Sequence, residues 1–204
     1  CIRDRIEADE FTKFEGSNAK ALGIENMAEA CVQGRGVLVD LEKRHGRDRA
    51  LVGYDELMRI LEEDNIEIEE GDMACFHTGF AQGLMDMKKN PNEHDLHNTF
   101  ACLDGRDEKL QDWIRDSGIS VIIADNYGIE DVSSPLPTGT NPIAMLPLHE
   151  LCIFKLGIHI GEMFYLTPLR DWLRRNKRNR FLLTAPPLRL PGAVGSPPSP
   201  IATV

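Results

Sequence analysis

Long apolar runs are missing from this chain of 204 residues. No apolar stretch reaches the roughly 18 residues that a membrane-spanning helix needs, so we expect no membrane partner. The overall composition, with 42% apolar and 27% charged residues, is that of a globular protein rather than a disordered chain. A length of 204 residues is enough for one domain with a sizeable hydrophobic core.

Basic residues are scarce relative to acidic ones. The chain has 23 Lys and Arg against 33 Asp and Glu, which gives a formal net charge of -10. A general nucleic-acid binder needs a basic surface to neutralise phosphates. We therefore expect no nucleic-acid partner.

Closely paired cysteines are also absent. The chain has five cysteines, an odd number, and none forms a Cys-x-x-Cys pair. This pattern favours free thiols in a reducing compartment, and hence a cytoplasmic location, over a disulfide framework or a zinc ribbon. The sequence has neither a Gly-x-Ser-x-Gly nucleophile elbow nor a phosphate-binding Gly-x-x-x-x-Gly-Lys-Ser/Thr loop. Covalent serine catalysis and nucleotide hydrolysis therefore have no sequence support.

Short apolar runs alternate with amphipathic segments along the chain. Strands are predicted for the apolar runs at 37–39, 73–76, 121–124, from 158 and at 181–183. Helices are predicted at 18–30, 54–63, 84–89, around 110–114 and at 148–156, with loops at 90–100 and 133–147. This alternation predicts an α/β fold with a mixed or parallel sheet. Half of the 12 prolines lie between Pro186 and Pro200, which predicts an extended tail over residues 186–204.

Polar side chains end three of the predicted strands, namely Asp40, His77 and Asp125, with Asn126 directly after the last. Ligands of open α/β sheets gather beyond the carboxyl ends of the strands, so these residues could line a site. Alternatively, they could be ordinary turn-forming or helix-capping residues, a role that Asp often has.

Glu162 and His149 form a second candidate site. Strand alternation from Ile158 to Phe164 places Glu162 on an apolar face, where a carboxylate is costly unless it is paired or bound to metal. The alternative is that the strand bends at Gly161 and exposes Glu162. A tight return at Gly157 could bring His149 to Glu162, and the two could then ligate a divalent ion. Two ligands are fewer than the usual three of a catalytic metal.

Two further polar clusters favour a structural interpretation. His94-Asp95-Leu96-His97 has loose ligand spacing in a loop-like segment. The segment from Arg170 to Arg180 holds six Arg or Lys and could bind an anion, although a solvated face is the commoner use of such a segment.

An ordered set of motifs resembles the metal-dependent cyclase family, which includes kynurenine formamidase and isatin hydrolase. The resemblance covers nearly all of the chain from Gly23 onward. The motifs are Gly23–Glu29, Gly34–Asp40, His77-Thr78-Gly79, Ala124-Asp125-Asn126, the segment from His149 to Glu162, Ala185–Leu188 and Gly192–Pro197.

This resemblance implies a single cyclase-like domain over residues 1–204 with a swivelling β/β/α fold, a mixed sheet and flanking helices. It implies hydrolysis of an amide or cyclic amide by a metal-activated water, as in an arylformamidase of tryptophan and kynurenine catabolism. Zinc or manganese, a small-molecule amide substrate and homo-oligomers are implied as well. His149 and Glu162 match the family's later pair of metal ligands, and Asp125, Asn126 and His77 would bind substrate.

The family's earlier His-x-Gly-Thr-His-x-Asp ligand motif is not present in these residues. His77 also departs from the family, whose members often have Arg before the Thr-Gly pair. The resemblance therefore implies that the chain is truncated before its first residue, and that alone it lacks the full site. The alternative is a non-catalytic small-molecule-binding member of the same fold with an incomplete metal site.

Overall fold

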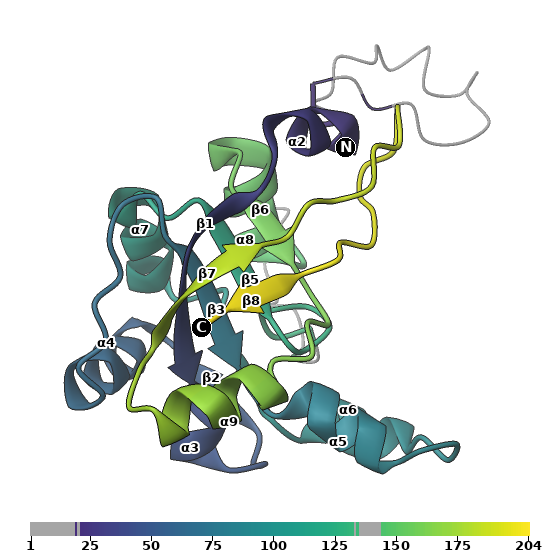
Figure 1. Ribbon diagram of the computed structural model, residues 1–204. Coiled ribbons are helices and arrows are strands. Elements are labelled where there is room, and N and C mark those ends of the chain that lie inside the picture. Colours follow the sequence, from purple (N-terminus) through teal and green to yellow (C-terminus); the bar gives the residue numbers. More distant parts are fainter. Residues whose placement is uncertain (1–18, 20, 133, 135–143) are drawn as a thin grey trace, which may run out of the picture. The chain divides into compact units, whose positions relative to one another are not determined.

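The computed structural model describes residues 19, 21–132, 134 and 144–204. The chain divides into two compact units, which are described separately below. Figure 1 labels the helices and strands. The larger unit comprises Gly36–Arg180, and the smaller unit combines the chain up to Arg35 with Phe181–Val204. The single domain expected over residues 1–204 stays a prediction.

The larger unit is built on four parallel strands in the order β6-β5-β3-β1. These strands are β1 (Gln33–Asp40, of which the part from Gly36 lies in this unit), β3 (Met73–His77), β5 (Val121–Ala124) and β6 (His159–Gly161). A second small sheet pairs β2 (Ala50–Val52) in parallel with β4 (Ala101–Leu103). Parallel strands are usually buried on both faces, which explains the continuous apolar runs of β3 and β5.

Helices follow most of these strands in the larger unit. They are α3 (Leu41–His45), α4 (Tyr54–Glu63), α5 (Phe80–Asp86), α6 (Glu93–Asn98), α7 (Glu108–Ser117), α8 (Pro147–His149), the π-helix η1 (Glu150–Leu156) and α9 (Thr167–Arg175). The core joins the apolar faces of α4 and α7, which pack against each other, to alternate residues of β1, β3 and β5. Leu57, Leu110 and Phe76 are among its fully buried members.

The smaller unit contains helix α2 (Ile24–Ala30) and an antiparallel pair of strands. Strand β7 (Arg180–Thr184) pairs with β8 (Ile201–Thr203), and an isolated bridge joins Pro187 to Pro198. The segment predicted as an extended tail therefore ends in a strand.

Parallel and antiparallel pairs both occur, so the predicted fold class, α/β with a mixed sheet and flanking helices, is confirmed. The helix predicted at 54–63 is α4, and the predicted apolar strands lie within β1, β3, β5 and β7. The loop predicted at 90–100 is wrong in part, because 93–98 is helix α6, which begins where the Asn92 side chain accepts a hydrogen bond from the Asp95 N–H. The loop predicted at 133–147 lies largely outside the described residues.

Candidate functional site

Two groups of polar side chains lie in the larger unit. The first, which we call the strand-end cluster, consists of Asp40, Glu42, His77, Asp125, Thr167, Arg170 and Arg174. The second, which we call the His149 centre, consists of Glu130, His149 and Glu162. All ten residues come from the larger unit, so each group is described within one compact body.

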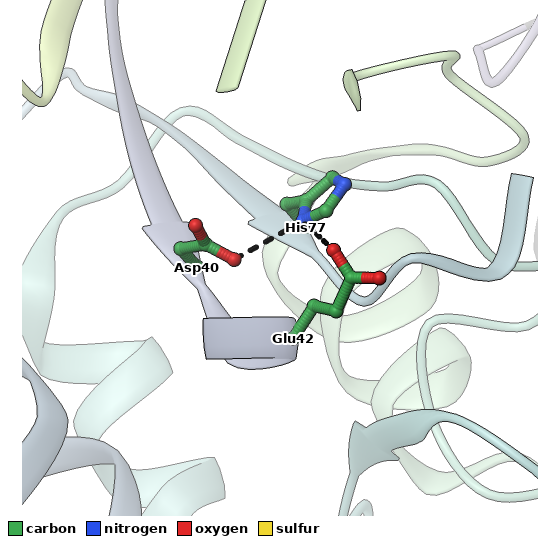
Figure 2. A group of neighbouring side chains, drawn as sticks. All are labelled: Asp40, Glu42 and His77. Atoms are coloured by element: carbon green, nitrogen blue, oxygen red, sulfur yellow. Dashed lines mark hydrogen bonds and ion pairs between the residues drawn. The ribbon is translucent and has the colours of Figure 1, made fainter. Parts of the chain in front are cut away.

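Strand register creates the strand-end cluster. Asp40 is the direct partner of His77 across the parallel β1–β3 pair, and both end their strands. Their side chains therefore meet, with His77 Nδ1 3.1 Å from Asp40 Oδ1 (Figure 2). Strand β5 lies beside β3 and places Asp125 Oδ2 3.9 Å from His77 Nε2. The three residues at the predicted strand ends thus lie together, as the rule for parallel sheets requires.

His77 is fully buried, and both of its ring nitrogens have partners. Besides the Asp40 contact at Nδ1, its Nε2 lies 3.2 Å from Thr167 Oγ1 at the start of α9. Burial alone would raise the pKa of Asp40. The hydrogen bond and charge of His77, followed by the charge of Arg174, outweigh burial and hold this pKa below its ordinary value.

Asp40, Glu42 and His77 offer three donor atoms within 4.8 Å of one another and could hold a divalent ion (Figure 2). The protein already supplies positive charge to both carboxylates. Arg174 Nε donates to Asp40 Oδ2 at 2.6 Å, and Arg170 donates to Glu42 Oε2. An ion here would have to compete with two guanidinium groups, so this cluster is first of all an ion-pair network.

The side chains of Asp125 and Asn126 accept hydrogen bonds from backbone N–H groups near the cluster. The buried Asp125 carboxylate accepts hydrogen bonds from Thr78 N, Thr78 Oγ1 and Gly79 N at 2.7, 2.8 and 2.9 Å. Asn126 Oδ1 accepts from Ile129 N at 3.0 Å. Asp125, Asn126 and His77 are all buried, with at most 7% of each residue exposed. Substrate binding by these three residues stays a prediction.

The His149 centre is formed where α8 runs into the π-helix η1. Gly157, at φ 75°, ends η1 in the left-handed conformation, and the chain returns into β6. The return brings Glu162 Oε1 to 3.3 Å from His149 Nε2. π-helical turns are rare and frequently occur at functional sites, and this one directly follows His149.

Glu162 combines features of both sequence interpretations. Strand β6 ends at Gly161, the residue at which one interpretation placed a bend that exposes Glu162. The Glu162 side chain is 35% exposed. Even so, its carboxylate is paired with His149 rather than free in solvent. That the two residues ligate a metal stays a prediction.

Glu130 is the member of this centre that sequence analysis missed. Its side chain is fully buried and its Oε1 lies 2.9 Å from His149 Nδ1. A hydrogen bond to Glu130, followed by one to Glu162, raises the pKa of His149 to about 9. Glu130 lies in irregular chain five residues after Asp125, where no periodicity marks a buried position.

Other candidates remain peripheral. His94 and His97 lie on the exposed helix α6, where His97 Nδ1 contacts Tyr127 Oη. The basic segment is divided between α9 and the chain that follows it, and two of its arginines, Arg170 and Arg174, point at carboxylates of the strand-end cluster. The four cysteines in the described part of the chain, Cys31, Cys75, Cys102 and Cys152, are free thiols.

The ionisation of His149 predicts a pH-dependent stability in the absence of metal. Its pKa is higher in the folded chain than the ordinary 6.5, so its contribution to stability is complete below pH 6.5 and is lost as the pH rises through about 9. The free energy of unfolding should fall by at most about 3 kcal/mol over this pH range. Urea unfolding at several pH values with a chelator should show this loss in the parent but not in His149→Gln; parallel pH profiles would contradict it.

The chain is thus an α/β protein with polar side chains at the ends of its parallel strands and a His–Glu pair beside the sheet. Its sequence is similar to that of a known family. The sequence profile of the family described as "Putative cyclase" matches residues 11–131, more than half of the chain. The chain belongs to this cyclase family.

Solved structures share the fold. A structure described as a novel cyclase is 29% identical, with a TM-score of 0.74 over 89% of this chain. Isatin hydrolase A from Ralstonia solanacearum is 16% identical, with a TM-score of 0.61 over 88% of the chain. A potential metal-dependent hydrolase with cyclase activity is 18% identical, with a TM-score of 0.55 over 94%.

The chain spans 57% of the novel cyclase, 63% of the isatin hydrolase and 73% of the potential hydrolase. No curated protein matches it. In the part of the chain that the structure describes, no helix is both long and apolar enough to cross a membrane.

Proposed function

We propose that the whole protein is a metal-dependent hydrolase of an amide or cyclic amide, of the arylformamidase type, and that His149 and Glu162 hold its divalent metal, zinc or manganese. The single observation that supports this most is the 3.3 Å approach of His149 Nε2 and Glu162 Oε1 in a member of the cyclase family. The names of the metal-dependent hydrolase and isatin hydrolase neighbours point the same way.

The donor set fits a divalent ion. Imidazole nitrogen and carboxylate oxygen are both ordinary zinc ligands, and two donors about 2.1 Å from one tetrahedral ion lie about 3.4 Å apart. The observed separation of 3.3 Å agrees with this value. Both side chains are partly exposed, at 25% and 35%, so an ion and a substrate could reach them. Two ligands leave room for others supplied by the rest of the protein.

A divalent metal held here would lower the pKa of a bound water and polarise the scissile carbonyl. The contribution of this chain would be to present the imidazole and the carboxylate at a fixed separation. His149 must lose its Nε2 proton before that nitrogen can act as a ligand, because metal ligands are deprotonated. We further propose a small-molecule amide substrate, self-association and a cytoplasmic location; the free thiols support the last of these.

Metal binding tests this proposal. Equilibrium dialysis of the intact protein against Mn²⁺ or Zn²⁺ should show binding, and Glu162→Gln should weaken it about 100-fold, because a neutral amide oxygen is a much weaker metal ligand than a carboxylate. Glu150→Gln is a matched control, since Glu150 adjoins His149 but pairs with Lys155. Equal binding by the parent and Glu162→Gln would overturn the assignment.

A non-catalytic binding member of the same fold is the second candidate. One observation favours it. Within the described residues, the His149 centre offers only two candidate metal ligands that lie close enough to share an ion, His149 Nε2 and a Glu162 oxygen. Metal-stimulated hydrolysis of N-formylkynurenine by the intact protein would exclude this candidate. Substrate binding without turnover, with or without metal, would favour it.

A further inference from the structure

Glu130 is a buried carboxylate to which the proposed function gives no role. Its charged side chain is fully inaccessible to solvent, because it lies among core residues in the chain after β5. A buried carboxylate is stable only where several donors surround it. The identity of those donors therefore indicates what Glu130 does.

Among the described residues, the donors to this carboxylate come from one place, the start of the segment that carries His149. Leu148 N donates to Glu130 Oε2 at 2.9 Å, and His149 N donates to Oε1 at 3.0 Å. The same Oε1 lies 2.9 Å from His149 Nδ1. Glu130 thus holds both the backbone and the ring of His149.

The position of Glu130 is itself fixed from two sides. Strand β4 holds its backbone, because Leu103 N donates to Ile129 O at 3.0 Å and Asp131 N donates to Leu103 O at 3.1 Å. Gly105 leaves the space for the carboxylate, since a Cβ at residue 105 would collide with Glu130 Oε2. The carboxylate therefore occupies the space that the missing side chain at residue 105 leaves open.

The two ring nitrogens of His149 consequently face different carboxylates. Nδ1 faces Glu130 inside the core, while Nε2 faces the partly exposed Glu162. A hydrogen bond that engages Nδ1 as a donor leaves the Nε2 lone pair to the metal, and ligating histidines commonly have such a carboxylate partner.

We propose that Glu130 is a positioning residue that fixes the ring orientation and the Nδ1–H tautomer of His149, so that Nε2 is presented beside Glu162 to a divalent metal. The inference rests on the proposed function, because it assigns Glu130 to the same metal centre. A merely structural Glu130 would cap the first turn of α8 and have no effect on metal binding beyond its effect on folding.

Glu130→Gln, which keeps the shape but removes the charge, tests this inference with Mn²⁺ alone as the probe. The Mn²⁺ affinity of the intact protein should fall about 10- to 100-fold. Asp107→Asn is the matched control, because Asp107, like Glu130, has three hydrogen-bond partners, the backbone N–H groups of Tyr54, Lys109 and Leu110, but does not touch His149. The control should lose stability but bind Mn²⁺ within about twofold of the parent.

A second measurement does not depend on metal. Nitrogen-15 NMR of the His149 ring, at a pH above its pKa, should show the Nδ1–H tautomer in the parent and a shift away from it in Glu130→Gln. Gly105→Ala, which displaces the carboxylate without removing it, should act in the same direction if Glu130→Gln does not fold.

The outcomes separate this inference from the proposed function. Equal Mn²⁺ affinity of the parent and Glu130→Gln, or an equal loss in Asp107→Asn, would overturn the role of Glu130. A parent that binds no Mn²⁺ would instead overturn the proposed metal centre. The tautomer measurement would then decide whether Glu130 still orients His149: a changed tautomer supports this, and an unchanged one rejects it.

Discussion

Asp125→Asn should lower the free energy of unfolding by about 3 kcal/mol. The fully buried Asp125 carboxylate accepts hydrogen bonds from Thr78 N, Thr78 Oγ1 and Gly79 N, and so fixes the chain between β3 and α5. An amide has one acceptor oxygen, so its NH₂ group would face a backbone N–H that no water can reach. Urea denaturation monitored by circular dichroism measures the change.

Asp107→Asn again provides the comparison. Asp107 accepts from several backbone N–H groups but is only partly buried, so water can replace some of the lost bonds and we expect a loss of about 1 kcal/mol. Equal losses in the two variants would show that burial does not control the effect. In that case the structural role assigned to Asp125 would fail.

Arg170→Met should destabilise the chain by about 3 kcal/mol, because it leaves the partly buried Glu42 without its closest cation and, among the described residues, leaves Arg174 as the only guanidinium that donates to the buried Asp40. Arg170 is 8% exposed, donates to Glu42 Oε2 and lies 4.0 Å from Asp40 Oδ1. Loss of the guanidinium removes the attraction but leaves the cost of taking the Glu42 and Asp40 carboxylates partly or wholly out of water. Thermal and urea unfolding of the variant would measure the loss.

A double-mutant cycle distinguishes this loss from lost packing. Glu42→Gln together with Arg170→Met should recover part of the stability, since the most closely paired charge is then absent as well. Arg175→Met, at an exposed position of the same helix, should change stability by about 0.5 kcal/mol or less. If the double variant only adds the two single losses, the ion pair does not explain the effect.

Much of the fold was predictable from the sequence, for local reasons. The apolar runs of β3 and β5 are continuous because both faces of these strands are buried, and α4 carries Leu57, Ile60 and Leu61 at helical spacing. The motif order also predicted the cyclase family. Helix α6 was missed because a capping Asn in a polar segment looks the same as a loop residue.

The sequence by itself determined which residues end the strands and which two candidate ligands flank the return at Gly157. Only the tertiary structure decided their partners. It placed Arg170 beside Glu42 and Arg174 beside Asp40, and it brought Glu130 to His149, which is 19 residues away in the sequence. The physical reason is that strand and helix periods are local properties. The pairing of buried charges instead depends on parallel register and on which distant segments the packed core brings together.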